Sequence, residues 1–113
     1  MKDTRFTGII WHKNANRGRM TWQEAIDYCA SLGDGWRLPT VHELSSLVDY
    51  SEKDQAKNLI GQGFTGVQSD YYWSSSSYAG YPSYAWGVYL SGGYVGYDGK
   101  SNSLYVWPVR SGQ

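Results

Sequence analysis

Cysteine and histidine are scarce in this 113-residue chain, and long hydrophobic runs are missing. Cys29 is the single cysteine, so no disulfide can form within the chain, and secretion is neither required nor excluded. His12 and His42 are the only histidines, and with one cysteine they cannot supply a usual zinc ligand set unless carboxylates or a second chain contribute. No apolar run approaches the length that crosses a bilayer, so we expect no membrane insertion.

Basic charge is scarce in the aromatic half of the chain, which holds only Lys100 and Arg110. Residues 1–19 hold five Lys or Arg against one Asp, which is +4, and residues 20–60 hold three against seven acids, which is −4. The remaining residues are neutral overall. A nucleic-acid-binding surface needs a basic stripe to neutralise phosphates, and the region rich in tyrosine and tryptophan has none. We therefore expect no nucleic-acid partner.

The first 30 residues lack the basic start, apolar run and cleavage site of a signal peptide. We expect a product that starts in the cytoplasm and either stays there, joins a virion or reaches a surface by another route. The length fits one domain, residues 1–113, and a content of 41% hydrophobic and 17% aromatic residues is typical of an ordered chain.

Recognisable catalytic and metal-binding motifs are missing too. Residues 61–66 match the spacing of a G-x-G-x-x-G phosphate loop, but no buried strand precedes them and no helix follows. Residues 74–77 are four serines without the setting of a hydrolase nucleophile, and Cys29 lies on the apolar stripe of a helix, where a thiol is inert. The acids after the second predicted helix lack the pattern of a calcium loop: Asp49, Glu52 and Asp54. We expect no enzyme activity, no cofactor and no metal.

Helix signals come first along the chain and strand signals follow. Two capping boxes, Thr21-Trp22-Gln23-Glu24 and Thr40-Val41-His42-Glu43, each predict a helix start followed by a one-sided apolar stripe. Residues 51–70 read as a polar loop with a helical turn at 56–60. The order predicts an α+β fold in which two amphipathic helices pack on a twisted antiparallel β-sheet. The predicted strands, rich in Tyr, Trp and Val, are 6–11, 71–78, 83–90, 94–98 and 103–110.

Alternation within the strands predicts which side chains face the core. Trp86, Val88 and Leu90 share one parity and are expected to be buried, as are Val95 and Val106. The positions between them belong to a narrow alphabet. From residue 89 to residue 105 every position is Tyr, Ser, Gly, Asp or Asn, apart from two Leu, one Val and one Lys.

Exposed tyrosines among small polar residues suit a binding surface. Tyrosine gives a large stiff contact with few torsions, and the small polar residues give adaptable hydrogen bonds, as in antibody paratopes. Exposed aromatic patches on small proteins usually mark interaction sites. The alternative is a tyrosine-rich face that only packs or oligomerises.

Short blocks that span nearly the whole chain carry a family resemblance. They are Gly8-Ile9-Ile10-Trp11, Thr21-Trp22-Gln23-Glu24-Ala25, Tyr28-Cys29, Trp36-Arg37-Leu38-Pro39-Thr40, Glu43-Leu44, Tyr72-Trp73-Ser74-Ser75, Tyr84-Ala85-Trp86, Gly93-Tyr94-Val95 and Val109-Arg110. Together they resemble the Lcl C-terminal-like family, a bacterial and phage family with the C-type lectin fold.

The resemblance implies a variable protein of a diversity-generating retroelement, in which a reverse transcriptase randomises template adenines, often in Asn codons. Changing the first two bases of an AAY codon yields Asn, Tyr, Ser, Gly and Asp, among others, and never a stop, which matches residues 81–105. This implies a constant scaffold at 1–78 and a variable region at 79–110 that binds an unknown protein or glycan. The positions assigned to ligand binding are Tyr81, Ser83, Tyr84, Gly87, Tyr89, Ser91, Tyr94, Gly96, Tyr97, Asp98, Ser101, Asn102 and Ser103.

The chain also departs from relatives. It lacks the E-P-N or Q-P-D triplet of calcium-dependent lectins, and its strand reads Tyr72-Trp73-Ser74-Ser75 in place of a W-N-D block. The related formylglycine-generating enzymes use a cysteine pair, which this chain lacks. Trp107-Pro108 stands where many relatives have Arg-Cys, which removes a partner for Cys29. We predict a non-enzymatic binding module, with an adhesin or structural subunit that uses the same face for self-assembly or glycan attachment as the alternative.

Overall fold

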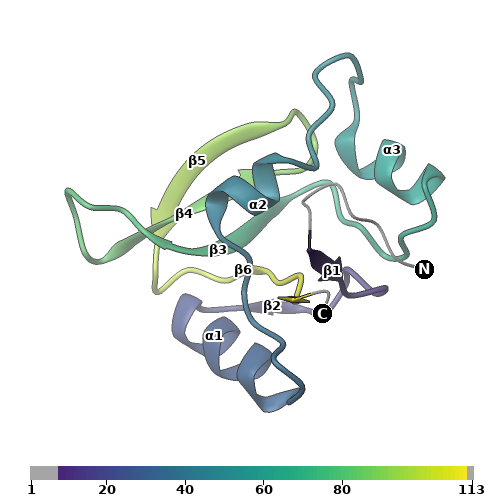
Figure 1. The fold of residues 1–113 in the computed structure, drawn as a ribbon. Helices are drawn as coiled ribbons and strands as arrows, with labels where there is room; N and C mark the ends of the chain where they lie inside the picture. The colour runs from purple at the N-terminus through teal and green to yellow at the C-terminus, as the bar shows by residue number, and fades with distance from the viewer. Residues whose placement is uncertain (1–7, 112–113) are drawn as a thin grey trace.

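The described part of the chain, residues 8–111 of a computed structural model, places its three helices before most of its strands. This order confirms the α+β class. The elements are β1 (Ile9–Trp11), β2 (Arg19–Met20), α1 (Trp22–Ser31), α2 (Val41–Ser45), α3 (Gln55–Gly61), β3 (Tyr71–Ser77), β4 (Tyr84–Tyr89), β5 (Tyr94–Gly99), β6 (Leu104–Tyr105) and β7 (Val109–Ser111) (Figure 1).

Five strands form the central sheet in the order β2-β6-β3-β4-β5, and β1 pairs with β7 in a separate two-stranded sheet. The meander of β3, β4 and β5 is antiparallel, as expected. However, β6 runs parallel to β3 through the pair Tyr72 and Tyr105, so the sheet is mixed and the prediction of a purely antiparallel sheet is wrong. Strand β2 carries no propensity signal of its own and was not expected.

The predicted strand at 103–110 is two strands with a break between them. Pro108 has no N–H to donate to a ladder, and its carbonyl instead accepts a hydrogen bond from the N–H of His12 at 2.9 Å. After this break the chain leaves the central sheet and β7 pairs with β1. The predicted strand at 6–11 is β1 in its described part, and Phe6 and Thr7 lie outside the described residues.

Both predicted capping boxes form. Thr21 Oγ1 accepts from the N–H of Glu24, and a Glu24 carboxylate oxygen accepts from the N–H of Thr21 at 2.9 Å. Thr40 and Glu43 repeat the arrangement at the start of α2. A single helical turn was expected at residues 56–60, and the structure has a longer helix there, α3. Asp54 caps the start of this helix, because its carboxylate accepts a hydrogen bond from the N–H of Lys57 at 3.1 Å.

The sheet has a hydrophobic core on each of its faces. Adjacent residues of β3 point to opposite sides, so Tyr72 packs into a core with Leu44 of α2 and Leu59 of α3, while Trp73 packs with Cys29 of α1. In Figure 1, α2 lies above β3 and β4, and α1 lies below β6 and β2. The two amphipathic helices are therefore in different layers.

Buried aromatic side chains hold the segment between β1 and α1, which includes β2, against the rest of the fold. The indole N–H of Trp73 donates to the carbonyl of Met20 at 2.8 Å, and that of Trp107 donates to His12 at 2.7 Å. The hydroxyl of Tyr72 donates to the carbonyl of Ala15 at 2.7 Å. Buried polar groups need such partners, so these bonds fix the path of the segment as well as the rings.

Alternation predicts the inward side chains correctly near the helices and fails beyond them. Val88, Leu90 and Val106 are fully buried, as expected. Val95 is 45% exposed and Trp86 is only half-buried, so the prediction is wrong for Val95 and only partly met for Trp86. Val95 is exposed because it lies on the edge strand β5, whereas α2 packs on β3 and β4. Trp86 lies closer to the β3–β4 turn than Val88 does, and there it packs against Tyr78.

Candidate functional site

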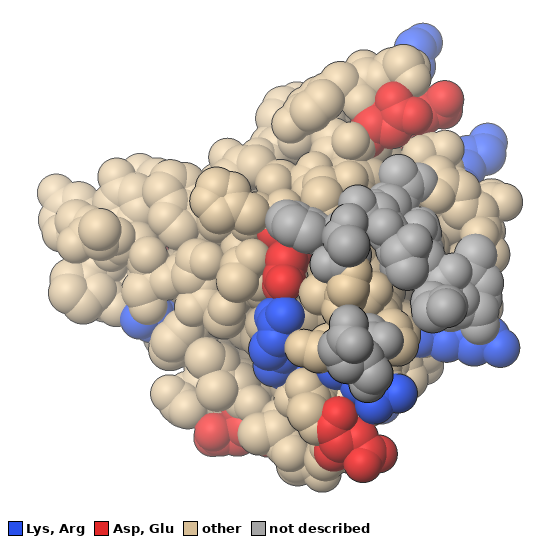
Figure 2. Space-filling view, in the orientation of Figure 1, with Lys and Arg blue, Asp and Glu red and all other residues tan. Residues whose placement is uncertain are grey.

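The end of the sheet that reaches beyond the helices is the candidate site. It is formed by the turn between β3 and β4, the ribbon β4–β5 and the turn at residues 100–103, and Figure 1 shows the first turn projecting from the body at the left. In Figure 2 this projecting lobe is tan apart from one cation at its lower edge. The site is thus a protruding surface with little charge.

Five aromatic side chains form what we call the large ring cluster on one face of the projecting end. The Tyr78 ring stacks on Tyr97 at 4.6 Å and on Tyr81 at 5.9 Å, measured between ring centroids. Trp86 and Tyr84 meet Tyr97 edge to face at 5.8 and 5.6 Å. Offset and edge-to-face contacts of this kind stabilise each ring pair by roughly 0.5–1.5 kcal/mol, which fixes the rings without burying them.

Three further rings form the small ring cluster. Tyr71 and Tyr89 are cross-strand partners whose centroids are 4.7 Å apart, and Tyr89 stacks on Tyr94 at 5.9 Å. Tyr94 is 63% exposed at the outer end of the stack. The inner ring, Tyr71, packs against the core on the α1 side, so the small ring cluster extends that core to the surface.

The two clusters lie on opposite faces of the β4–β5 ribbon. Side chains of alternate residues in a strand point to the same face. Tyr84 and Trp86 therefore share a face with Val88, which packs in the core under α2 and α3. Tyr89 shares the other face with Ala85, which packs in the core on the α1 side. The sequence predicted a single ligand-binding face, and the structure divides its aromatic residues between two.

Most of the assigned ligand-binding positions lie at the surface. Tyr89, Ser91, Gly96 and Asp98 are half-buried, and Gly87 is buried, so its assignment to a ligand-binding surface is wrong. A Cβ on Gly87 would lie 2.7 Å from the carbonyl oxygen of Tyr72 on the neighbouring strand. The exposed assigned positions are Tyr81, Ser83, Tyr84, Tyr94, Tyr97, Ser101, Asn102 and Ser103.

Sequence reasoning missed three rings of the candidate site, Tyr71, Tyr78 and Trp86. Tyr71 and Tyr78 belong to the segment expected to be constant scaffold, and Trp86 was expected in the core. The Tyr78–Trp86 contact, edge to face at 5.0 Å, shows why Trp86 is only half covered: its cover is another surface ring. The available signal was the unbroken run of aromatic positions on both sides of the β3–β4 turn.

Polar groups beside the rings are held by contacts within the chain. Asp98 accepts hydrogen bonds from the side chain of Asn102 at 2.6 Å and from the N–H of Gly99 at 2.8 Å. The ammonium group of Lys100 lies 4.0 Å from the centroid of the Trp22 ring and donates to Ser77. The turn at 100–103 is therefore pre-organised, which lowers the entropy cost of binding through it.

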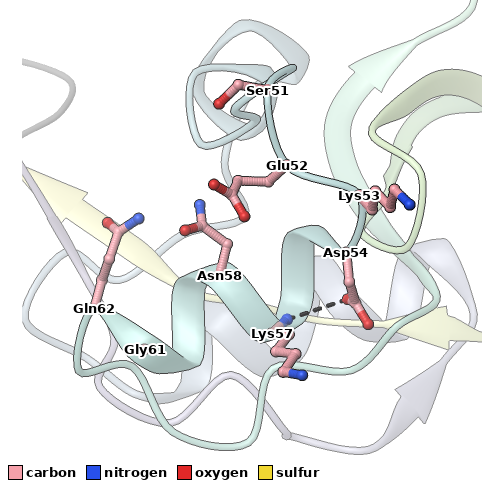
Figure 3. A pocket seen from close by; sticks show the side chains of 8 residues that line it. All are labelled: Ser51, Glu52, Lys53, Asp54, Lys57, Asn58, Gly61 and Gln62. Carbon is pink, nitrogen blue, oxygen red and sulfur yellow. Dashed lines mark hydrogen bonds between the residues drawn. The ribbon is translucent and has the colours of Figure 1, made fainter.

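A larger hollow lies elsewhere, beside α3. It has a volume of about 650 Å³ and is open to solvent, and Figure 3 shows Glu52, Asn58 and Gln62 along it. A smaller hollow of about 210 Å³ lies between α1 and β3. Neither hollow is lined by tyrosine, histidine or cysteine. Within residues 8–111, no group of three or more His, Cys, Asp and Glu side chains could hold a metal ion.

The groups best suited to catalysis by residue type are not activated. Burial raises the pKa of the Cys29 thiol to about 12, with Arg17 acting weakly in the opposite direction, so the thiol is protonated at neutral pH. Burial, together with the charge of Arg17, lowers the pKa of His12. His12 packs against the ring of Trp36 at 4.8 Å and accepts from the N–H of Asn14, which are structural contacts.

The fold and the site define a class of protein: a small α+β globule that displays two clusters of partly exposed aromatic rings. Residues 1–110 match the Lcl C-terminal domain, so the chain belongs to the Lcl C-terminal domain family. No curated protein is similar enough to count as a match. Over the described residues, no helix is both long and apolar enough to span a membrane.

Proposed function

We propose that this chain is a non-enzymatic ligand-binding domain with the C-type lectin fold, and that its two ring clusters are the contact surface. The observation that carries the proposal is the exposure of tyrosines that are nonetheless fixed by neighbouring rings: Tyr81 and Tyr94 are each 63% exposed and Tyr97 is 52% exposed. Rigid, amphipathic and exposed rings are the contact elements of recognition surfaces.

The shape of the site favours a macromolecule as the ligand. Small molecules bind in concave pockets that cover most of their surface, whereas the large ring cluster lies on the projecting end of the sheet and the small ring cluster lies on the opposite face, near the β4–β5 turn. A protruding ribbon can instead insert into a concavity of a protein or lie along a glycan chain. The scarcity of cations on the ribbon argues against nucleic acid, since only Lys100 carries a positive charge between residues 71 and 109.

Diversification by a retroelement accounts for the narrow alphabet of residues 81–105. Its members, Tyr, Ser, Gly, Asp and Asn, fill the exposed positions of β5 apart from Val95, and the exposed positions 101–103 of the following turn. The buried Leu90, Leu104 and Val106 between them lie outside that alphabet. A surface that changes over an unchanged core is what a diversified binding protein requires.

A display library tests the binding surface. We expect that randomising Tyr81, Tyr84, Tyr94 and Tyr97 leaves most members folded, because none of the four belongs to either hydrophobic core and each lost ring contact costs only roughly 0.5–1.5 kcal/mol. Selection against lysozyme as the probe is expected to yield binders with Kd below about 1 μM. The matched control randomises four exposed positions of α1: Gln23, Asp27, Ala30 and Ser31.

The control library is expected to give no such binders, because α1 lacks neighbouring rings that fix a contact surface. Equal numbers of binders from the two libraries would show that the ribbon binds no better than any other exposed surface of the chain. A ribbon library that is mostly unfolded would show that the rings belong to the core, and the proposed surface would be wrong.

The genomic neighbourhood tests the retroelement. We expect a near-copy of the segment that encodes residues 79–110 close to the gene, with differences confined to template adenines, together with a reverse-transcriptase gene. The codon for Gly87 is expected to lack adenine in the template, because this position is buried. Sequencing the downstream region checks all three expectations, and the absence of both repeat and reverse transcriptase leaves an undiversified binding domain.

The second candidate function is an adhesin or structural subunit that assembles with itself or attaches to glycans. One observation favours self-assembly, namely that β5 is an edge strand with no described strand on its outer side. Measurement of the solution mass separates the two functions, because a structural subunit is expected to form open assemblies that keep growing with concentration, whereas a ligand-binding domain is expected to stop at a small closed species.

A further inference from the structure

The outer edge of β5 is the longest unpaired strand edge in the described central sheet. That sheet ends at β2 on one side and at β5 on the other. β2 has only two residues, one of them Arg19, whereas β5 has six. Both faces of β5 are also accessible, since Val95 is 45% exposed on one face and Tyr94 is 63% exposed on the other.

The hydrogen-bonding pattern identifies the backbone groups that point outward from β5. The N–H of Lys100 donates to the carbonyl of Ser83 at 2.9 Å, in register with the strand pairing. Bonded and non-bonded pairs alternate along antiparallel strands, so Asp98, Gly96 and Tyr94 bond to β4. The N–H and C=O groups of Val95 and Tyr97 therefore point away from the sheet.

The third outward N–H, that of Gly99, is already capped. It donates to the carboxylate of Asp98 at 2.8 Å, which ends the free edge at Tyr97. Natural sheets protect such edges with lysine, proline or a bulge, and residues 94–99 contain none of these. Two donors and two acceptors on consecutive outward positions form a template for another strand.

We propose that two copies of this chain associate through β5, pairing antiparallel about a two-fold axis at Gly96. In this register Val95 of each copy lies opposite Tyr97 of the other, and the two pairs exchange four backbone hydrogen bonds. The two Gly96 residues face each other in the close, non-bonded position, where the absence of side chains allows the approach. The exposed side chain of Val95 then packs on the ring of the second copy's Tyr97.

Charge favours a second copy as the occupant of this edge. The whole chain has a formal charge of zero, so two copies do not repel each other at long range. Asp98 is the only charged residue of β5, and in the Gly96-centred register it lies opposite Tyr94. Centring the pair on Tyr97 would instead set the two Asp98 carboxylates diagonally across from each other, where like charges repel.

The pairing enlarges the candidate binding surface. A two-fold axis that joins two sheet edges is perpendicular to the sheet, so equivalent faces of both copies point the same way. Two five-stranded sheets become one continuous sheet, and the two large ring clusters lie on the same face of it. The inference stands independently of the proposed ligand, because it depends on the strand edge rather than on what the rings bind.

Sedimentation equilibrium of the wild-type chain tests the pairing. Between about 10 μM and about 1 mM, a range suited to a small interface, the weight-average mass is expected to rise from 12.8 kDa toward twice that value. Val95→Pro removes one outward donor without touching the bonds to β4, and edge positions tolerate proline. This variant is expected to keep the monomer mass throughout, while Val95→Thr, which keeps the N–H, is expected to associate like the wild type.

Hydrogen exchange supplies a readout that does not depend on the proline variant folding. In dilute wild-type protein the amides of Val95 and Tyr97 are expected to exchange at least tenfold faster than those of Gly96 and Asp98. At high concentration this difference is expected to close. Val95→Lys, which keeps the N–H but adds a charge to the edge, is expected to stay monomeric.

Three results would overturn the pairing. The first is a wild-type mass of 12.8 kDa at every concentration. The second is association of Val95→Pro and Val95→Lys to the same extent as the wild type, which would place the contact elsewhere. The third is an associated state in which the amides of Val95 and Tyr97 stay unprotected, which would indicate stacking through the ring clusters.

Discussion

Replacing Gly87 by alanine is expected to lower the free energy of unfolding by about 2 kcal/mol, within the range of about 1–3 kcal/mol found for overpacked sites. The new Cβ would lie 2.7 Å from the carbonyl oxygen of Tyr72. That oxygen belongs to the backbone of β3, paired on both sides, so it cannot move away without disturbing the ladder. Calorimetry is expected to show a fall in Tm of roughly 4–8 °C for each kcal/mol.

The matched control is Gly96→Ala on the cross-strand partner of Gly87. A Cβ at this position would meet the hydroxyl of Tyr71 at 3.2 Å, and that hydroxyl is the end of a side chain that can turn aside. We expect a loss of about 0.5 kcal/mol or less. A Tm for Gly87→Ala equal to that of Gly96→Ala would contradict the argument from close approach, and Gly87 would then be a suitable position for diversification.

Gly87 also limits what can vary in the segment at 79–110. Gly87 belongs to the alphabet of the exposed positions by residue type, yet it lies between β3 and β5 with no room for a side chain. Residue type alone therefore does not separate positions that vary from positions that need a small residue. Only the distance to the neighbouring strand makes that distinction.

Local signals in the sequence were sufficient to predict where α1 and α2 begin. Each capping box involves residues three apart, and both Thr–Glu pairs form the two reciprocal hydrogen bonds expected. The burial of Val88 and Leu90 also followed from local alternation. These features depend on residues that are close together in the chain, so they can be predicted from the sequence.

The features that could not be predicted depend on contacts between distant segments. Val95 has the pattern of a buried strand residue, but whether it is covered depends on how far α2 reaches across the sheet. The parallel pairing of β6 with β3 depends on the path of the whole chain between them. The placement of α1 and α2 on opposite faces of the sheet could not be predicted either, because an apolar stripe on a helix does not indicate which face of a sheet the helix will cover.

The Arg37–Glu43 pair is a bidentate ion pair outside the ladders. Both guanidinium nitrogens Nη1 and Nη2 donate to the two carboxylate oxygens of Glu43, at 2.8 and 2.9 Å. Glu43 also accepts from the N–H of Thr40 as part of the capping box. The backbone of Arg37 meanwhile exchanges two hydrogen bonds with Val109 at 2.7 and 2.8 Å. One pair thus connects the start of α2 to the C-terminal strand.

The lowered pKa of Glu43 determines how the stabilisation by this pair changes with pH. Burial by itself would raise the pKa of Glu43, but the hydrogen bonds from Arg37 and Thr40 and the positive charge of Arg37 together lower it. The unfolded chain therefore binds the proton more tightly than the folded chain. The stabilisation is fully present above the ordinary glutamate pKa of about 4.3 and is lost as the pH falls through the lowered value.

Arg37→Met is expected to lower the free energy of unfolding at pH 7 by about 2 kcal/mol. Breaking a fully buried pair costs about 3–5 kcal/mol, and the smaller value applies because the Arg37 side chain is 42% exposed and solvent screens it. The buried carboxylate of Glu43 is then left without its cation. Urea unfolding from pH 3 to pH 7 is expected to show a gap between wild type and variant that widens as the pH rises.

The double variant Arg37→Met, Glu43→Gln separates the charge from the packing. It is expected to regain part of the stability that Arg37→Met loses at pH 7, because it no longer buries an unpaired carboxylate, and to differ from wild type mainly above pH 4. A constant gap between wild type and Arg37→Met at every pH would show that the guanidinium acts by packing alone. The link between α2 and β7 would then depend on the backbone bonds of Arg37 and Val109 rather than on the ion pair.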